Sequence, residues 1–515
     1  MQGAEVLLRT LVASDVTVCF MNPGTSEMQF VAALDRVPGM RPILCLYEGV
    51  CSGAADGYAR MLGKPASTLL HLGPGLANAL SNFHNARKAG SPVVSIVGEH
   101  STYHLNYDAP LTSDIHAFAA TVSTHVFQPE TALEIGESTV EAISASRIPP
   151  GHVAQLIVPA DLSWSEAGDP DRIDCTLHRL PPDRKKVSEV AKLLQQGRKV
   201  SFVLGGTALL EKGLTASGAL AALHKVRVFA NRNSGRLESG RGRFQPQRIA
   251  YFPEPAEAML GGTEHLVLVE SAAPVSFFGY PESRSYLAPD DAEVHTLTTP
   301  AEDGASALAQ LAALTGASPA PLVLPAPLEL RTLTDAPLTA DLMGQIVSAM
   351  LPEDAIVSDE SISCSEPVFQ HLLRAKNHTY LPVTGGSIGQ GLPVALGAAV
   401  ACPNRKVVAL EADGSAMYTL QALWTMAREQ LDVTTVIFNN RRYRILDVEM
   451  QRTGAKGFGP AAEDMIALER PDLDFVKLSQ GLGVAAVRST NAGQFAEAFA
   501  DAMNRKGPYL IEAIL

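Results

Sequence analysis

Two polar segments have the residue types and spacing that could bind a charged cofactor. Asp413-Gly414-Ser415 follows the apolar run 407–410, and Asn440 follows a second apolar run at 433–438. The stretch between Asp413 and Asn440 is long enough for one helix and a returning strand. Both side chains are therefore expected at the C-terminal edge of neighbouring parallel strands, where ligands bind in such sheets.

These residues suit a hard cation that carries a diphosphate. Magnesium prefers oxygen ligands, and Asp413 offers a carboxylate, Asn440 an amide oxygen and the Arg442 main chain a carbonyl. Gly414 allows a close approach of the backbone, while the Ser415 hydroxyl and the following helix N-terminus could hold phosphate oxygens. Taken singly, Asp-Gly is also a common turn and the asparagine a common loop residue. The strand context and spacing favour the metal site.

A carboxylate in apolar surroundings marks the N-terminal part. Glu48 follows the largely apolar residues 44–47, which predict a strand ending at the acid, and it precedes a small-residue segment at 49–60 that predicts a helix. Burying a carboxylate is costly unless it is paired or protonated. Glu48 is therefore either a functional acid or an acid at a helix N-terminus that the helix dipole stabilises.

Together these segments resemble the thiamine diphosphate-dependent enzymes, in particular the benzoylformate decarboxylase and acetolactate synthase group. The resemblance lies in Asp413-Gly414-Ser415 with Asn439-Asn440, and in Glu48 followed by Asp56-Gly57-Tyr58-Ala59. One departure is Ala412, where the family has glycine. The resemblance implies thiamine diphosphate and Mg²⁺ as cofactors, with Glu48 hydrogen-bonded to the aminopyrimidine ring and with a C2 ylid and an enamine on the reaction path.

The same resemblance implies further site residues. Pro23-Gly24-Thr25-Ser26 is similar to the family's opening loop, where Thr25 and Ser26 would meet a substrate carboxylate, although a plain turn explains them about as well. His71 is similar to a proton-handling histidine of benzoylformate decarboxylases, although a lone histidine is more often structural. Ile388 would be the aliphatic wedge under the bent cofactor. The remaining implied cofactor contacts are Leu76, Ser363, Gly386 and Tyr443.

The chain reads as three α/β domains with parallel sheets. Short apolar runs alternate with helical patterns, as expected when strands are covered on both faces; these runs lie at 16–20, 43–46, 93–97, 153–158, 200–204, 266–269, 407–410 and 433–438. Proline-containing linkers are expected at about 163–184 and 315–337. The predicted domains are residues 1–165 (pyrimidine-binding), 185–318 (central, Rossmann-like) and 338–515 (diphosphate- and metal-binding).

Composition narrows the environment and the partners. The 515 residues carry a net charge of −13, which disfavours nucleic acid as a partner. The N-terminus lacks the pattern of a signal peptide, and no apolar run is long enough to span a bilayer. Six cysteines without CxxC spacing indicate reduced thiols, so a cytoplasmic protein without membrane association is expected.

The favoured function is a 2-oxo acid decarboxylase or carboligase, and the alternative is an acetolactate synthase-type condensation of two 2-oxo acids. Gly279 falls where benzoylformate decarboxylases have a second catalytic histidine, which counts against simple decarboxylation. A non-catalytic paralogue is disfavoured because Glu48, Asp413 and Asn440 are all present. No FAD is expected, because no flavin-binding segment is found near 269–278. The family geometry also implies a homodimer or homotetramer, in which Glu48 and Asp413 reach one cofactor from different subunits.

Overall fold

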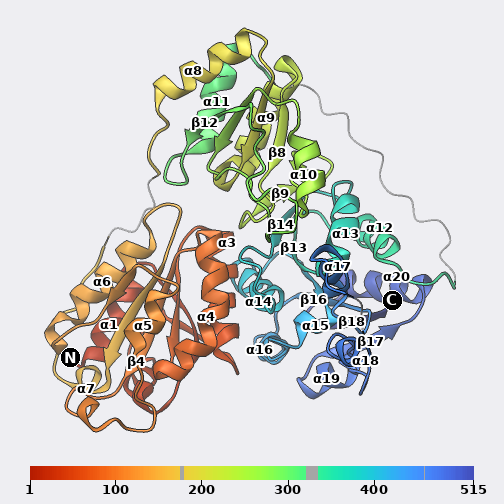
Figure 1. Cartoon of the computed structure of the whole chain (residues 1–515). Helices are drawn as coiled ribbons and strands as arrows, with labels where there is room; N and C mark the ends of the chain where they lie inside the picture. Colours follow the sequence, from red (N-terminus) through yellow and green to blue (C-terminus); the bar gives the residue numbers. More distant parts are fainter. Residues whose placement is uncertain (174–178, 320–334, 457–458) are drawn as a thin grey trace.

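The computed structural model describes residues 1–173, 179–319, 335–456 and 459–515. Cys175 and most of the second predicted linker lie outside the described residues, as does part of the first. Within the described parts the chain folds into three α/β bodies arranged as a triangle, which Figure 1 shows in red to orange, yellow to green, and cyan to blue. The predicted fold class is confirmed.

The N-terminal body is a parallel sheet with strand order β2-β1-β3-β4-β6-β5. Its inner strands are buried along their whole length, which explains their continuous apolar sequence. The strands are β1 Val18–Asn22, β2 Arg41–Leu44, β3 Ala66–Leu70, β4 Val93–Glu99, β5 His125–Phe127 and β6 Val153–Pro159. The helices are α1 Gly3–Ala13, α2 Met28–Ala33, α3 Glu48–Leu62, α4 Leu72–Ala89, α5 Ile115–Ala120, α6 Ile135–Ser146 and α7 Ala160–Trp164.

The middle body is a smaller parallel sheet with strand order β10-β8-β7-β11-β12. Its strands are β7 Val200–Leu204, β8 Arg227–Ala230, β10 Gln247–Arg248, β11 His265–Val269 and β12 Glu293–Thr298. Its helices are α8 Arg184–Gln195, α9 Glu211–His224, α10 Pro253–Leu260 and α11 Gly304–Thr315. β12 is an edge strand and pairs only with β11 among the described strands.

The C-terminal sheet has the order β17-β18-β16-β15-β13-β14-β9 and is parallel except at one edge. Its strands are β13 Ala355–Glu360, β14 His378–Pro382, β15 Val407–Ala412, β16 Val433–Asn439, β17 Ala485–Ser489 and β18 Tyr509–Ile514. The helices are α12 Ala340–Met350, α13 Ser365–Leu372, α14 Gly391–Ala401, α15 Asp413–Ala416, α16 Ala422–Arg428, α17 Arg444–Arg452, α18 Pro460–Asp464, α19 Phe475–Gly481 and α20 Ala492–Asn504.

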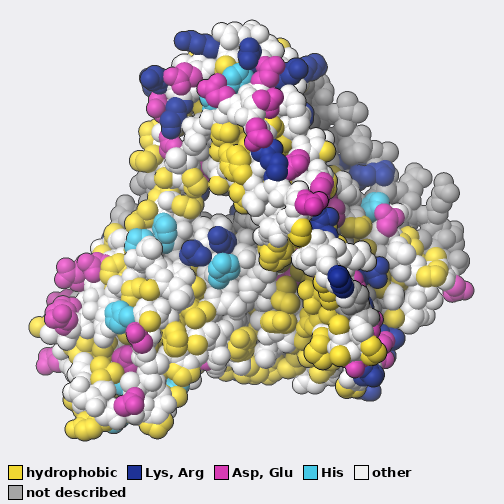
Figure 2. Space-filling view, in the orientation of Figure 1, with side chains coloured by type: hydrophobic (Ala, Val, Ile, Leu, Met, Phe, Trp, Pro, Cys, Tyr) yellow, Lys and Arg dark blue, Asp and Glu magenta, His cyan; other side chains and the backbone are white. Residues whose placement is uncertain are grey.

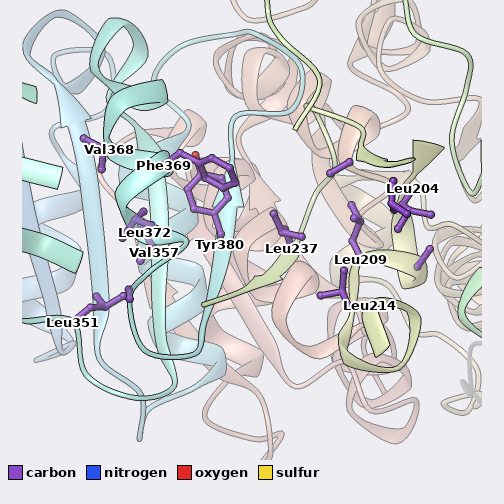
Figure 3. Packing of buried hydrophobic residues seen from close by; sticks show 14 of the residues in the cluster. Leu204, Leu209, Leu214, Leu237, Leu351, Val357, Val368, Phe369, Leu372 and Tyr380 are labelled. Carbon is purple, nitrogen blue, oxygen red and sulfur yellow. The ribbon is translucent and has the colours of Figure 1, made fainter. Parts of the chain in front are cut away.

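The antiparallel edge strand of this sheet, β9 Leu237–Ser239, belongs to the middle segment of the chain. The division into 1–165, 185–318 and 338–515 does not place this strand with the third sheet. A hydrophobic cluster follows the same path, from Leu204 and Leu209 through Leu237 to Tyr380 and Phe369 (Figure 3). The middle and C-terminal bodies therefore share a core.

The N-terminal and C-terminal bodies meet through two helices rich in small residues, α3 and α14. A Cβ at Gly57 would lie 2.2 Å from the Val394 carbonyl oxygen, and a Cβ at Gly397 would lie 1.9 Å from that of Ala54. Only glycine allows this approach of the two backbones.

The surface charge is relevant to the prediction of no nucleic-acid partner, and the helix lengths are relevant to the prediction of no membrane association. On the face shown in Figure 2, basic side chains lie scattered among acidic and apolar ones. Among the described residues, no helix combines the length and apolar character needed to cross a membrane.

Candidate active site

Asp413 and Asn440 lie at the C-terminal ends of the neighbouring strands β15 and β16, and their loops are hydrogen-bonded together. Asp413 accepts hydrogen bonds from the backbone N–H of Gly414 (2.8 Å) and of Arg441 (2.5 Å). Asn440 accepts one from the Arg442 N–H (2.9 Å). Burial raises the pKa of Asp413, and these backbone donors oppose the rise. The carboxylate and amide oxygens predicted to share a metal therefore lie in adjoining loops.

The donor set fits a hard cation with a diphosphate. The donors to Asp413 are backbone N–H groups, and no cationic side chain among the described residues forms an ion pair with it. The Arg442 guanidinium points instead to Asp447 and Glu463, both at 2.6 Å, and its backbone carbonyl accepts a hydrogen bond from the Arg444 N–H (2.8 Å). Such a buried carboxylate beside neutral oxygens suits Mg²⁺.

The Gly414 turn lies directly under an aromatic ring and next to a second strand end. A Cβ at Gly414 would lie 2.3 Å from the Tyr443 ring, so glycine is required there. The Ser415 hydroxyl donates to the carbonyls of Ala412 (3.1 Å) and Glu360 (3.3 Å). Ser415 therefore connects the turn to the end of β13.

A cavity of about 890 Å³ lies between the middle and C-terminal bodies; Asp413, Gly414, Ser415, Asn440 and Tyr443 do not line it, but Glu360, which accepts a hydrogen bond from Ser415, does. Ser363, Gly386 and Ile388, three of the predicted cofactor contacts, line it. Much of the remaining wall is aromatic or aliphatic and includes Tyr251, Phe252, Phe277, Phe278, Ile445 and Leu446. Gly386 has φ +78°, and a Cβ there would lie 2.4 Å from the Phe277 ring. The volume is ample for a cofactor together with a small substrate.

Two buried glutamates, Glu360 and Glu411, face each other near the loop that carries Ile388, and Glu360 holds that loop. Glu360 accepts hydrogen bonds from the N–H groups of Gly389 (2.8 Å) and Gly391 (2.6 Å). Glu411 lies opposite Glu360 in the sheet register, and its carboxylate has no hydrogen-bond partner among the described residues. Burial raises the pKa of Glu360 to about 7 and that of Glu411 well above its usual range. Sequence reasoning missed this pair, although an acid inside the apolar run before Asp413 was a visible signal.

Glu48 is the first residue of α3, because β2 ends earlier, at Leu44. The prediction that a strand ends at Glu48 is therefore wrong. In the structure, Glu48 lies at the N-terminus of a helix. Its carboxylate is mostly buried (8% exposed) and accepts a hydrogen bond from Asn78 (3.0 Å). An acid at this helix end is compatible with both the functional and the structural interpretation.

His71 is oriented by an acid that sequence reasoning missed. Its Nδ1 lies 2.8 Å from Glu27, which also accepts a hydrogen bond from the Gly24 N–H (2.7 Å). Burial raises the pKa of Glu27, and the neighbouring His71 opposes the rise. A Cβ at Gly24 would lie 2.3 Å from the His71 ring, so the loop and the histidine are packed together. The sequence signal that could have identified this acid was the position of Glu27 three residues after Gly24, which directly precedes a short helical turn.

The other residues of the N-terminal body that were predicted as site residues lie close to His71 or in the hydrophobic core. Thr25 and Ser26 start the 3₁₀ turn Thr25–Glu27, with Thr25 exposed and Ser26 and Pro23 half-buried. Leu76 is fully buried in the core of the N-terminal body. Among the described residues, the cavity lining comes from the middle and C-terminal bodies alone. Asn82 nevertheless joins the two bodies near the predicted site, because it donates to the carbonyls of Gly49, next to Glu48 (2.8 Å), and of Gly389, next to Ile388 (3.0 Å). The roles of the predicted site residues stay predictions.

These features define an α/β protein in which polar loops that could hold a charged cofactor follow the ends of parallel strands. Residues 1–133 match the family described as thiamine pyrophosphate enzyme, N-terminal TPP binding domain, and residues 361–513 match its C-terminal TPP binding domain. The chain therefore belongs to the thiamine diphosphate (thiamine pyrophosphate) enzymes. The predictions of the family, the enzyme class and thiamine diphosphate as cofactor are confirmed.

Similar proteins include both predicted subgroups. A Mycobacterium tuberculosis protein with the provisional name acetolactate synthase large subunit IlvX is 47% identical over 521 residues, which cover 100% of this chain and 99% of that protein. Benzoylformate decarboxylase of Pseudomonas aeruginosa is 28% identical over 526 residues, 96% of each chain. The solved Rhodococcus jostii 4-hydroxybenzoylformate decarboxylase superimposes with a TM-score of 0.87 at 24% identity, covering 100% of this chain and 99% of that one, which shows a common fold.

Proposed function

We propose that this enzyme uses thiamine diphosphate and Mg²⁺ to decarboxylate a 2-oxo acid with an apolar group. The observation that carries the proposal is the largely apolar cavity, which Ser363, Gly386 and Ile388 line and whose lining residue Glu360 accepts a hydrogen bond from Ser415 of the Asp413 turn. When bound, the cofactor supplies an electron sink for the electrons that the leaving carbon dioxide releases. The protein supplies binding, orientation and proton transfer.

The C-terminal body holds the cofactor in this proposal. Asp413, Asn440 and the Arg442 carbonyl bind Mg²⁺, and Gly414, Ser415 and Ser363 contact the diphosphate. Gly386 and Tyr443 line the ring site, where Ile388 supports the bent cofactor. The hydrogen bonds from Gly389 and Gly391 to Glu360 support this proposal, because they fix the backbone that directly follows Ile388.

The N-terminal body handles protons and the substrate carboxylate. Glu48 hydrogen-bonds the aminopyrimidine ring, and His71, oriented by Glu27, transfers a proton next to the substrate. Thr25 and Ser26 donate to the substrate carboxylate, while Pro23-Gly24 and Leu76 shape the ring site. The 2.8 Å contact between His71 Nδ1 and Glu27 supports this role, because it fixes the imidazole and leaves Nε2 for proton transfer.

A panel of aryl, branched and short 2-oxo acids tests the reaction and the substrate together. Assays with thiamine diphosphate and Mg²⁺ should release carbon dioxide and aldehyde, with the highest kcat/KM for apolar substrates. Glu48→Gln should lower turnover at least about a hundredfold, whereas Glu137→Gln on the exposed face of α6 should not. Full turnover by Glu48→Gln, or a preference for charged side groups, would contradict the proposal.

A second candidate is an acetolactate synthase-type ligation of two 2-oxo acids. The full-length similarity to the Mycobacterium tuberculosis protein favours it, as does Gly279 in the region where a second histidine is expected. Product analysis by mass separates the two functions, because ligation yields a hydroxyketone acid in place of free aldehyde.

We also propose that the active form is a homodimer or homotetramer with sites shared between subunits. The cavity lining supports this proposal, because none of its residues in the described parts comes from the N-terminal body, which carries Glu48. Differently tagged Glu48→Gln and Asp413→Asn chains, co-expressed and purified as mixed dimers, would then contain one intact site of two. They should regain about half of wild-type activity. If both residues serve a site within one chain, mixed dimers stay as inactive as either parent.

A cytoplasmic location without a flavin completes the proposal. The described cysteines are free, and most of them are buried, which supports a reducing compartment. Activity of flavin-free protein tests the absence of FAD, and fractionation of cells tests the cytoplasmic location.

A further inference from the structure

Three potential metal ligands meet at the edge of the middle sheet, on residues that do not line the cavity. His265 begins β11 and lies opposite Glu293, the first residue of the edge strand β12. His295 is two residues further along β12 and therefore points to the same face of the sheet as Glu293. The fold thus brings two imidazoles and a carboxylate together from two strands.

Their ligand atoms form a compact triangle. His265 Nδ1 lies 3.0 Å from His295 Nε2, and the Glu293 carboxylate lies 3.4 Å from the first and 3.8 Å from the second. An ion with tetrahedral ligands at about 2.0 Å keeps those ligands about 3.3 Å apart. The three atoms therefore already approximate one face of a zinc coordination tetrahedron.

A direct hydrogen bond between the two imidazoles is the alternative to a shared metal ion. The neutral imidazole is the form that binds metals. A hydrogen bond between the two histidines would also account for the 3.0 Å distance, but it gives Glu293 no function at this place.

We propose that His265, Glu293 and His295 bind one divalent transition-metal cation of the zinc class. Two nitrogens and one carboxylate oxygen suit Zn²⁺, Co²⁺ or Ni²⁺ and not the Mg²⁺ expected at Asp413. The fourth position faces solvent, because the Glu293 side chain is 68% exposed and that of His295 is 23% exposed. On the middle body in Figure 2, histidine and acidic side chains lie near one another at the surface.

The bound ion connects the edge strand to the rest of the sheet. β12 pairs with β11 on one side, and the metal adds a second connection between the first residues of the two strands. Because an ion that binds only the folded state stabilises it, the expected effect is structural: a higher unfolding temperature, with turnover unchanged.

Metal titration of the full chain tests the site. Protein saturated with thiamine diphosphate and Mg²⁺ is titrated with Co²⁺ and then with Zn²⁺, and binding is followed by calorimetry and by Co²⁺ visible absorption. We expect one Co²⁺ per chain with the intense absorption of a low-coordinate site, displacement by Zn²⁺, and a rise in the unfolding temperature.

Three variants separate this site from incidental binding by histidine. His295→Gln should abolish binding, and Glu293→Gln should weaken it at least about tenfold. His125→Gln changes a histidine whose ring packs against His152 at 5.0 Å, and it should bind like wild type. Absence of stoichiometric uptake by wild type would overturn the proposal, as would unchanged affinity of His295→Gln. If His295→Gln does not fold, the exposed Glu293 decides, because unchanged affinity of Glu293→Gln overturns it equally.

Discussion

A buried ion pair on α3 connects all three bodies, and its removal should destabilise the whole chain. Asp56 and Arg60 are one helical turn apart, with side chains 0% and 1% exposed and a 2.6 Å contact. Arg60 also donates to the carbonyls of Pro382 (2.9 Å) and Gly235 (3.4 Å). Asp56 accepts from Gln390 (2.8 Å) of the C-terminal body. The perturbation is Arg60→Met, which keeps the volume and removes the charge.

The magnitude follows from what this change leaves behind. Without Arg60, the Asp56 carboxylate remains buried and keeps only hydrogen bonds from neutral donors, Ser91 (2.5 Å) and Gln390. Removing one partner of a buried pair costs about 3–5 kcal/mol of unfolding free energy. Asp56→Asn combined with Arg60→Met removes both charges, so the double variant should be more stable than the single one by at least about 1 kcal/mol.

Urea unfolding of the cofactor-loaded enzyme at neutral pH measures these differences. The matched control is Arg9→Met, which breaks an exposed helical pair with Glu5 and should leave the midpoint unchanged. A loss below about 1 kcal/mol for Arg60→Met would refute the reasoning. A double variant less stable than the single one would refute it as well.

Three other buried contacts lead to distinct outcomes. Gly397→Val should cost about 3 kcal/mol and Gly397→Ala less, by thermal unfolding, because any Cβ meets the Ala54 carbonyl. Glu411 has a raised pKa, so the stability linked to its proton is complete below its unfolded pKa and declines as pH rises. The urea midpoint of Glu411→Gln should therefore rise relative to that of wild type between about pH 5 and about pH 8. A difference between the two midpoints that stays constant with pH would contradict this. Glu27→Gln should lower kcat about tenfold to a hundredfold with KM little changed, since His71 loses its orienting acid; an unchanged kcat would remove that role.

The sequence predicted the parts of the fold that depend on local pattern. Continuous apolar runs identified the buried parallel strands because a strand covered on both faces needs no polar alternation. The Asp413 and Asn440 loops came together as predicted, since neighbouring parallel strands end at the same sheet edge. Motif spacing sufficed here because β15, α15, α16 and β16 are consecutive in the chain.

What the sequence did not predict depends on contacts between distant segments. β9 pairs with β14 although more than a hundred residues separate them, and no local signal marks a strand that leaves its own sheet. The partnership of Glu27 with His71 was missed for the same reason, as was that of Glu360 with Glu411. The strand predicted to end at Glu48 was wrong because 45–47 are apolar enough for a strand but lead directly into α3.

Backbone strain links the separate parts of the predicted site. Leu72, Ile362 and Arg441 all have φ near +50°, at 55°, 48° and 58°, a region that non-glycine residues rarely occupy. Each adjoins a predicted site residue, namely His71, Ser363 and Asn440. A conformation of this kind costs about 1–3 kcal/mol and persists where surrounding contacts fix it. At Arg441 the contact is visible, because the strained turn directs its N–H to Asp413. The motifs indicated His71, Ser363 and Asn440, but not the left-handed turns beside them, because positions 72, 362 and 441 are not glycine.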